Sequence, residues 1–286
     1  MSETRTPTPT GRALSALDPT FRDHPDEYID LLRSAEPVHQ DREFDRIVLT
    51  RAEDIESVLN ERTMAKDPRK SRPGAYIRAF EKVDENYQPS MLFADDPDHK
   101  RLRGPVSKAF NQQSVEAIRP RIAEIANRLL DEIPDPRRFD VVAAYSNPLP
   151  TIAIAAMLGI DEKDQRDFKR WSDSQVHSLN PLRTEGQTAS LDQGRTALSQ
   201  YFAEVIRERR KNRGTDLISS LISAEEDCQE LTEAEIIGMC QLLLVAGNVT
   251  TTDLIGNGVL ALLRNPTELA KLRAQPELIR NAVEEV

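Results

Sequence analysis

The sequence predicts a mainly α-helical protein with a small β region near its N-terminus. From residue 52 onward, apolar residues recur at the three- and four-residue spacing of amphipathic helices. Alternating and β-branched residues instead occupy residues 37–40 and 46–50, which predicts a short pair of strands. A chain of 286 residues is also long enough to bury a large core.

The predicted helices follow one another along most of the chain. Pro148 and Pro150 are expected to bend one of them, because proline removes a backbone donor. We expect residues 1–17 to form a flexible arm and residues 18–286 to form one domain. The predicted helix ranges are 52–60, 98–111, 114–133, 139–158, 162–178, 191–211, 216–224, 232–265 and 266–274, with another beginning near Pro276.

Two irregular stretches, 71–90 and 179–190, are polar and contain proline or glycine. Long irregular segments in a compact domain often cover a binding site. We expect both to act as lids over a pocket.

Composition narrows the class of protein. The net charge of −10 argues against nucleic acid as a partner, because phosphate binding requires a basic surface. No uninterrupted apolar run reaches the roughly 18 residues of a membrane span, and the polar N-terminus does not resemble a signal peptide. Cys228 and Cys240 form no metal-binding or disulfide pattern. We therefore expect a cytoplasmic protein without a nucleic-acid or membrane partner.

The predicted helix at 232–265 is the most informative segment. Thr232 followed by Glu235 fits a capping box, and the helix would be about 50 Å long at 1.5 Å per residue. Residues 236–249 are apolar on nearly every side, as in a helix through a protein core. Yet each glycine in a helix costs roughly 1 kcal/mol relative to alanine. The helix nevertheless contains Gly238, Gly247, Gly256 and Gly258, and threonine at 250, 251 and 252.

Helical spacing places Leu243, Ala246, Gly247 and Thr250 on one face, at i, i+3, i+4 and i+7. These residues form a notch of small side chains beside a hydroxyl. One interpretation is close packing of a neighbouring helix, with the threonine hydroxyls bonded to carbonyls one turn earlier. The other is a site for a small ligand beside a hydrogen-bond donor. Both interpretations remain open at this point.

A second unusual helix begins after an acidic turn at 95–98. His99, Arg103, Val106 and Phe110 share one stripe, which we expect to face the core. A buried arginine requires an anion. That anion is either a nearby acidic side chain or the carboxylates of a bound ligand. The neighbouring cations Lys100, Arg101 and Lys108 are expected to be solvated, with docking of an acidic partner as the alternative.

Together these two segments resemble bacterial-type cytochromes P450. The stretch Asp-Pro-Asp-His-Lys-Arg-Leu-Arg at 96–103, with Val-Ser-Lys-Ala-Phe at 106–110, is similar to the C helix of that family. The stretch Leu-Leu-Leu-Val-Ala-Gly-Asn-Val-Thr-Thr-Thr at 242–252 is similar to its oxygen-binding I helix. The order of helices and the early strand pair also fit, so the resemblance covers about residues 18–286.

The resemblance implies a haem beside the long helix and a role for each motif residue. His99 and Arg103 would bind the haem propionates through charge-assisted hydrogen bonds. Ala246 and Gly247 would leave room for dioxygen. The catalytic residue would be Thr250, whose hydroxyl would hydrogen-bond the bound oxygen and help deliver protons to it.

The same resemblance implies a haem-dependent monooxygenase that inserts one atom of O2 into a small organic substrate. Because the chain contains no flavin or nicotinamide motif, electrons would come from a separate ferredoxin-type or flavodoxin-type donor. The irregular stretches 71–90 and 179–190 would face the substrate, and the residues do not indicate which substrate that is.

Two departures from the family pattern stand out. The family usually places an acidic residue directly before the oxygen-site threonine, where this chain has Val249. The family's Glu-x-x-Arg helix would begin at Glu285, one residue before the last. By resemblance, the C-terminal part of the fold and the axial cysteine would lie beyond Val286. We therefore expect the 286-residue chain to be an inactive fragment, and neither Cys228 nor Cys240 to ligate iron.

The competing hypothesis is a haem-free helical binding protein, or the product of a decayed gene, without catalysis. The absorption spectrum of the reduced protein under carbon monoxide distinguishes the two hypotheses. A thiolate-type Soret shift supports the enzyme, and its absence from a well-folded chain supports the alternative.

Overall fold

The computed structural model describes residues 8–81, 83–85, 87–161, 164–180, 182–228 and 231–286. The chain divides into two compact units. Unit 1 consists of Met1–Pro89, Phe93–Asp95 and Asn180–Leu182, and unit 2 consists of Ser90–Leu92, Asp96–Leu179 and Arg183–Val286.

Unit 1 contains the strand pair that the sequence predicts. Strands β1 (Val38–Asp41) and β2 (Arg46–Leu49) are antiparallel, with Val38 opposite Leu49 and Asp41 opposite Arg46. The predicted helix at 52–60 is confirmed as α3. The other elements of this unit are η1 (Gly11–Leu14), α1 (Pro19–Asp23), α2 (Pro25–Ala35), α3 (Ala52–Asn60), η2 (Pro68–Lys70) and η3 (Tyr76–Ala79).

The fully buried carboxylate of Asp41 organises the strand pair. It accepts hydrogen bonds from the Thr10 hydroxyl at 2.6 Å, the Gly11 backbone N–H at 2.9 Å and Arg46 Nε at 2.9 Å. Burial alone would raise the pKa of Asp41, but these hydrogen bonds outweigh it and hold the pKa below its usual value. Gly11 and Leu14 are buried in η1. The proposed arm boundary at residue 17 stays a prediction.

Unit 2 is helical among its described residues, as the sequence predicts. Its elements are α4 (Asp98–Ala109), α5 (Gln112–Asp131), η4 (Val142–Ser146), α6 (Pro148–Leu158), α7 (Gln165–Gln175), η6 (Val176–Leu179), α8 (Glu185–Lys211), α9 (Leu217–Cys228), α10 (Glu233–Arg264), α11 (Pro266–Ala274), η7 (Pro276–Leu278) and α12 (Ile279–Glu285).

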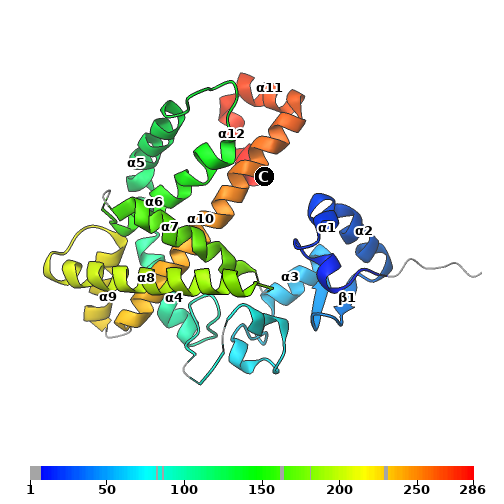
Figure 1. Ribbon diagram of the computed structural model, residues 1–286, viewed down its shortest axis with the longest axis horizontal. Helices are drawn as coiled ribbons and strands as arrows, with labels where there is room; N and C mark the ends of the chain where they lie inside the picture. Colours follow the sequence, from blue (N-terminus) through cyan, green and yellow to red (C-terminus); the bar gives the residue numbers. More distant parts are fainter. Residues whose placement is uncertain (1–7, 82, 86, 162–163, 181, 229–230) are drawn as a thin grey trace, which may run out of the picture. The chain divides into compact units, whose positions relative to one another are not determined.

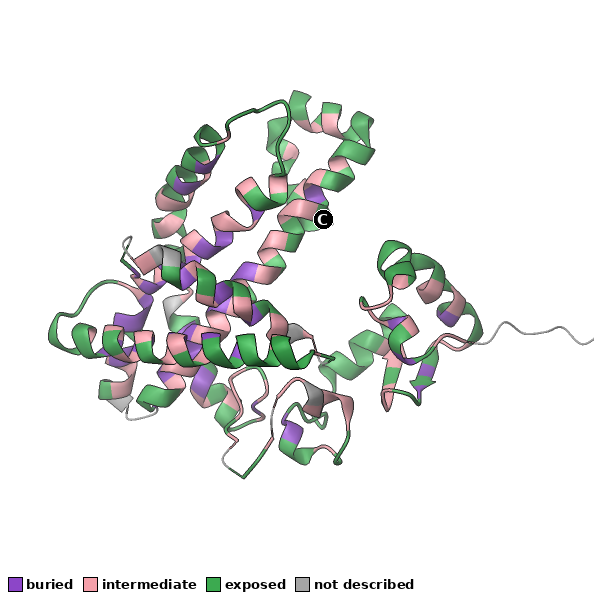
Figure 2. Cartoon of the chain, viewed as in Figure 1, coloured by how far each residue is buried: buried purple, intermediate pink, exposed green. Residues whose placement is uncertain are grey.

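Helix α10 runs through unit 2, with α6 and α8 packed against it (Figure 1). The predicted capping box is present: Thr232 Oγ1 accepts the Glu235 backbone N–H at 3.2 Å, and the Glu235 carboxylate accepts the Thr232 N–H at 2.8 Å. The first half of the helix carries most of its buried side chains (Figure 2). These are Ile236, Met239, Cys240, Leu244 and Asn248.

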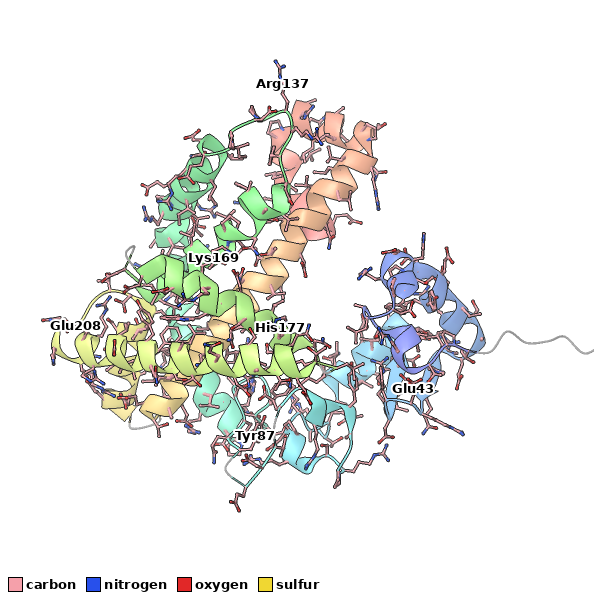
Figure 3. The ribbon with its side chains drawn as sticks, in the orientation of Figure 1. Glu43, Tyr87, Arg137, Lys169, His177 and Glu208 are labelled. Carbon is pink, nitrogen blue, oxygen red and sulfur yellow. The ribbon has the colours of Figure 1, made fainter. Side chains whose placement is uncertain are left out.

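The predicted bend near Pro148 takes the form of a change of helix type. Residues Val142–Ser146 form one π-helical turn, and α6 starts at Pro148. Proline fits the first position of a helix because its missing N–H would have no partner there. Lys169 of α7, labelled in Figure 3, donates to Asn147 Oδ1 at 2.9 Å and ties α7 to this junction.

Two predictions about irregular structure need correction. Helix α8 begins at Glu185, not 191, because Thr184 and Gln187 form a second capping box. The irregular stretch predicted at 179–190 is therefore shorter. In the stretch 71–90, Tyr76–Ala79 forms a single 3-10 turn, and residues 82 and 86 lie outside the described part.

By length and hydropathy, one helix of the described residues could cross a membrane. It is α10, with 28% of its most apolar window buried. A helix through the core of a globular protein meets the same criteria.

Candidate functional site

From Ala246 onward, α10 exposes one face. Ala246, Thr250, Asp253 and Asn257 are all exposed, and they recur at i, i+4, i+7 and i+11. The opposite side stays buried through Asn248. The notch predicted from the sequence therefore lies where the exposed face begins.

Gly247 lies at the edge of this face, next to α6. A Cβ atom at Gly247 would lie 3.9 Å from Cδ1 of Ile154, which is an ordinary van der Waals contact. Helix packing is thus part of the surroundings of Gly247, as one interpretation of the sequence predicts. Packing does not require a glycine there, because an alanine would fit against Ile154.

The hydroxyl of Thr250 is bonded within its own helix. Thr250 Oγ1 donates to the Ala246 carbonyl oxygen at 2.5 Å, the back-bond that the packing interpretation predicts. A hydroxyl that donates one hydrogen bond still has lone pairs that accept. Thr250 is exposed, so a ligand on this face can reach its oxygen.

Few of the residues around Thr250 on α10 could donate a proton to it. Val249, at the position where an acid was expected, is half-buried. The buried Asn248 accepts a hydrogen bond from Thr252 Oγ1 at 3.4 Å, within the helix. Asp253 is exposed one turn further along. Along α10, the acidic side chain nearest in sequence to Thr250 is therefore the exposed Asp253.

On α4 the structure corrects the predicted inward stripe. The buried side of α4 consists of Leu102, Pro105 and Val106. Arg103 is exposed, and the His99 side chain is 27% exposed. Leu102, Pro105 and Val106 supply the apolar contacts of the helix, so the arginine does not need to be buried.

Neither His99 nor Arg103 has an acidic partner at hydrogen-bonding distance among the described residues. His99 Nδ1 lies 3.8 Å from Asp96 Oδ1, which is too far for a hydrogen bond. Among the described residues, Arg103 has no ion pair and no hydrogen bond through its side chain. The structural salt bridge proposed as an alternative for Arg103 is therefore not formed there, and the guanidinium is available to an external anion.

Arg101 behaves differently from the sequence-based expectation that it is merely solvated. Its Nη2 lies 2.7 Å from Glu235 Oε1, and the same guanidinium lies 3.2 Å from Asp98. The hydrogen bond that Arg101 donates to Glu235 outweighs the opposing effect of burial and raises the pKa of Arg101. This pair joins α4 to the first turn of α10.

The structure thus links the two predicted groups indirectly. His99 and Arg103 belong to α4, while Ala246, Gly247 and Thr250 belong to α10, and the Arg101–Glu235 pair joins the two helices. Glu235 precedes Ala246 by 11 residues, or about 17 Å along the helix axis. No hydrogen bond or ion pair of the described residues joins the two groups directly.

The two cysteines lie on different helices, α9 and α10. Cys240 is fully buried in α10, and burial raises the pKa of its thiol to about 12. Cys228 is the last residue of α9. Within the described ranges, His, Cys, Asp and Glu form no group of three or more that could hold a metal ion.

Comparison with known proteins identifies the family. The family model described as cytochrome P450 matches residues 40–284. The chain belongs to the cytochrome P450 family.

Curated relatives agree with this assignment. The chain is 37% identical to cytochrome P450 107B1 of Saccharopolyspora erythraea over 258 residues, which cover 87% of the chain and 62% of that relative. It is 35% identical to 6-deoxyerythronolide B hydroxylase of the same organism, covering 85% of the chain and 60% of the relative. The chain therefore spans less than two thirds of the length of these P450 relatives.

Solved structures show the same fold. A myxobacterial cytochrome P450, CYP267B1, in complex with myristic acid matches with a TM-score of 0.82 and 34% identity, over 94% of this chain and 68% of that one. P450BioI, solved in complex with an acyl carrier protein that carries hexadec-9Z-enoic acid, matches with a TM-score of 0.81 and 31% identity, over 94% and 69%. The predicted fold class, including the early strand pair, is confirmed.

The family implies a haem cofactor and monooxygenase chemistry, and the residues present fit a haem. An anionic, flat and mostly apolar group requires a smooth apolar face with cations at its edge. The exposed face of α10 begins with the small side chain of Ala246 and the Thr250 hydroxyl, its carboxylate Asp253 follows only at the next turn, and Arg103 is a cation without an anionic partner among the described residues.

Proposed function

We propose that this chain forms the part of a haem-dependent monooxygenase that receives dioxygen and grips the acidic edge of the haem. The observation that carries this proposal is the exposed face of α10 at Ala246 and Thr250, in a chain whose α4 presents Arg103 without an anionic partner among the described residues. In the proposed reaction, one atom of O2 enters a small organic substrate.

Each residue has a specific part in this proposal. His99 and Arg103 hold the propionates, because charge-assisted hydrogen bonds to carboxylates are short and strong. Ala246 and Gly247, with their small side chains, would leave room for dioxygen beside the haem. Bound haem supplies the redox chemistry that activates dioxygen.

Thr250 is the residue that we propose to handle protons. Its oxygen keeps accepting capacity while its proton is held by the Ala246 carbonyl. In that arrangement the hydroxyl would accept a hydrogen bond from water and could donate its own proton to an acceptor on the exposed face of α10. Val249 supplies no carboxylate, so we propose that water on the exposed face delivers protons to Thr250 in place of an acidic side chain.

The electrons are proposed to come from a separate ferredoxin-type or flavodoxin-type protein, and the enzyme is proposed to act in the cytoplasm. The substrate class stays a small organic molecule. Met239 and Leu243 precede the site on α10, buried and half-buried respectively, and are candidates for the wall of the substrate cavity.

A metal-free porphyrin tests the proposed grip without depending on iron ligation. We expect protoporphyrin IX, titrated into the chain and followed by its fluorescence, to bind the wild-type chain more tightly than the Arg103→Gln variant by about tenfold, the effect of losing one charge-assisted hydrogen bond. Protoporphyrin IX dimethyl ester, which lacks the carboxylates, should show no such difference.

The control for this titration is Arg119→Gln. Arg119 pairs with Glu116 inside α5 at 2.7 Å, so its removal deletes an equivalent charge away from the site. Equal affinities for Arg103→Gln and the wild-type chain would contradict the proposed grip. A well-folded chain that binds no porphyrin at all would support the haem-free alternative.

A further inference from the structure

We propose that Arg101 is a positioning residue, which holds α4 against the start of α10 so that His99 and Arg103 meet the acidic edge of the ligand at a fixed distance from the Ala246 face. This inference rests on the proposed function. It gives Arg101 a role that neither motif assigns, because the Arg101 side chain is bonded to Glu235 of α10 and is not itself proposed to contact the ligand.

The geometry of the pair supports a positioning role. Arg101 Nη2 and Glu235 Oε1 are 2.7 Å apart, and both side chains are about two thirds or more buried, with 34% and 27% exposed. Ion pairs on an open surface contribute little, whereas a partly buried charged hydrogen bond fixes its partners more firmly. Arg101 also sits midway between His99 and Arg103 on α4, so it controls the placement of both.

The Glu235 end of the pair is itself held firmly. The Glu235 carboxylate accepts the backbone N–H of Thr232 at 2.8 Å, and it lies 3.1 Å from the Thr232 hydroxyl. A carboxylate at a helix N-terminus is also favoured by the helix dipole. These bonds hold the Glu235 carboxylate in place at the start of α10. Its hydrogen bond with Arg101 therefore fixes the position of α4 relative to α10.

A second arginine restrains the same end of α10 from another side. Arg210 of α8 lies 2.7 Å from Glu225 of α9 and 3.6 Å from Glu233, the first residue of α10. The start of α10 thus stands between arginines of α4 and α8. Because α10 is one continuous helix, fixing its start also fixes the positions of Ala246 and Thr250 relative to α4.

The experiment is a double-mutant cycle read by protoporphyrin IX affinity and by urea unfolding of the same proteins. Because Arg101 acts through its neighbours, Arg101→Gln should weaken binding about threefold to tenfold in the wild-type background and by less than about twofold when Arg103 is already Gln. Arg101→Lys, which keeps one charge for Glu235, should recover most of the lost affinity.

Two controls separate positioning from general stability. Arg119→Gln removes an arginine–glutamate pair that lies within a single helix, and it should leave the affinity unchanged. With the dimethyl ester of the porphyrin, Arg101→Gln should have no effect, because no carboxylates remain to be positioned.

The outcomes distinguish this inference from the proposed function. If Arg103→Gln weakens binding but Arg101→Gln does not, or if the two effects simply add, the positioning role is wrong and the proposed function stands. If Arg103→Gln has no effect, both fail. Should Arg101→Gln not fold, the same comparison is made with Arg101→Lys, which should lose up to about twofold in affinity with Arg103 present and nothing with Gln at 103.

Discussion

Thr250 Oγ1 donates a hydrogen bond to the carbonyl oxygen of Ala246, 2.5 Å away and one helical turn earlier. This bond fixes where the hydroxyl oxygen points, on a face of α10 that is exposed at both residues. A threonine in the middle of a helix often bonds in this way for structural reasons alone. A proton-delivering role and a purely structural role of Thr250 therefore predict different effects when the threonine is replaced.

The first prediction concerns Thr250→Ala in a completed, haem-loaded chain. If the hydroxyl delivers protons, the variant should consume oxygen at a similar rate but form at least about tenfold less product for each O2 consumed, since a positioned proton donor contributes that much or more. The measurement is the ratio of product to oxygen consumed. Thr251→Ala, one residue along, should keep the wild-type ratio. A ratio unchanged in Thr250→Ala removes Thr250 from the proposed role.

The second prediction tests whether Gly247 serves helix packing or leaves room for a ligand. A Cβ there meets only ordinary contacts with Ile154, and a Cβ at Gly238 meets nothing within 4 Å. Alanine at either position should therefore stabilise the chain by up to about 1 kcal/mol in urea unfolding, through helix propensity. Only Gly247→Ala should weaken porphyrin binding. Equal porphyrin affinities in the two variants would leave Gly247 without a ligand role.

The third prediction is an acid sensitivity that arises at Asp41. Its hydrogen bonds hold the pKa below the usual value, so the folded state is favoured above the unfolded pKa of about 4. That stabilisation should fall as the pH is lowered through the folded pKa of Asp41. Urea unfolding at pH 7 and pH 3.5 measures the loss.

Asp41→Asn provides the control for this pH dependence. It should cost about 2 kcal/mol at pH 7, the scale for hydrogen bonds to a charged group, and flatten the decline toward low pH. An equally steep decline in Asp41→Asn would place the acid-sensitive group elsewhere.

The fourth prediction concerns Cys240. Burial raises the pKa of its thiol to about 12, and thiol reagents react with the thiolate. In a Cys228→Ser background, a disulfide reagent at pH 8 should label Cys240 only after unfolding in urea. Rapid labelling of the folded protein would show that the thiol is accessible and reopen the question of its role.

Much of the fold could be predicted because the local signals were strong. The helix at 52–60, the helix at 266–274 and the capped start of α10 lie where spacing, proline and the Thr232–Glu235 box place them. The short helices α1 and α2 were missed, since neither has a long apolar repeat. A signal was present: Asp18 accepts the Thr20 N–H at 2.9 Å, and each helix starts with a proline.

The site residues were harder to place. Spacing put Arg103 on the same stripe as Val106, but a stripe of four residues spans a wide arc, and the buried part of α4 is centred on Leu102 and Pro105. The partner of Arg101 could not be predicted at all. Glu235 is 134 residues away, and no local pattern in the chain pairs the two.

The change of burial along α10 predicts that the two halves of this continuous helix open locally at different rates. Backbone amides in the enclosed half, up to Val245, should exchange with deuterium slowly, while those beyond Asp253 should exchange faster, because fewer neighbours oppose local opening. The Ala246–Thr250 face stands at the boundary between these parts. A planar ligand seated there would extend protection toward the C-terminal end of the helix, so deuterium uptake downstream of Thr250 would report occupancy of the face.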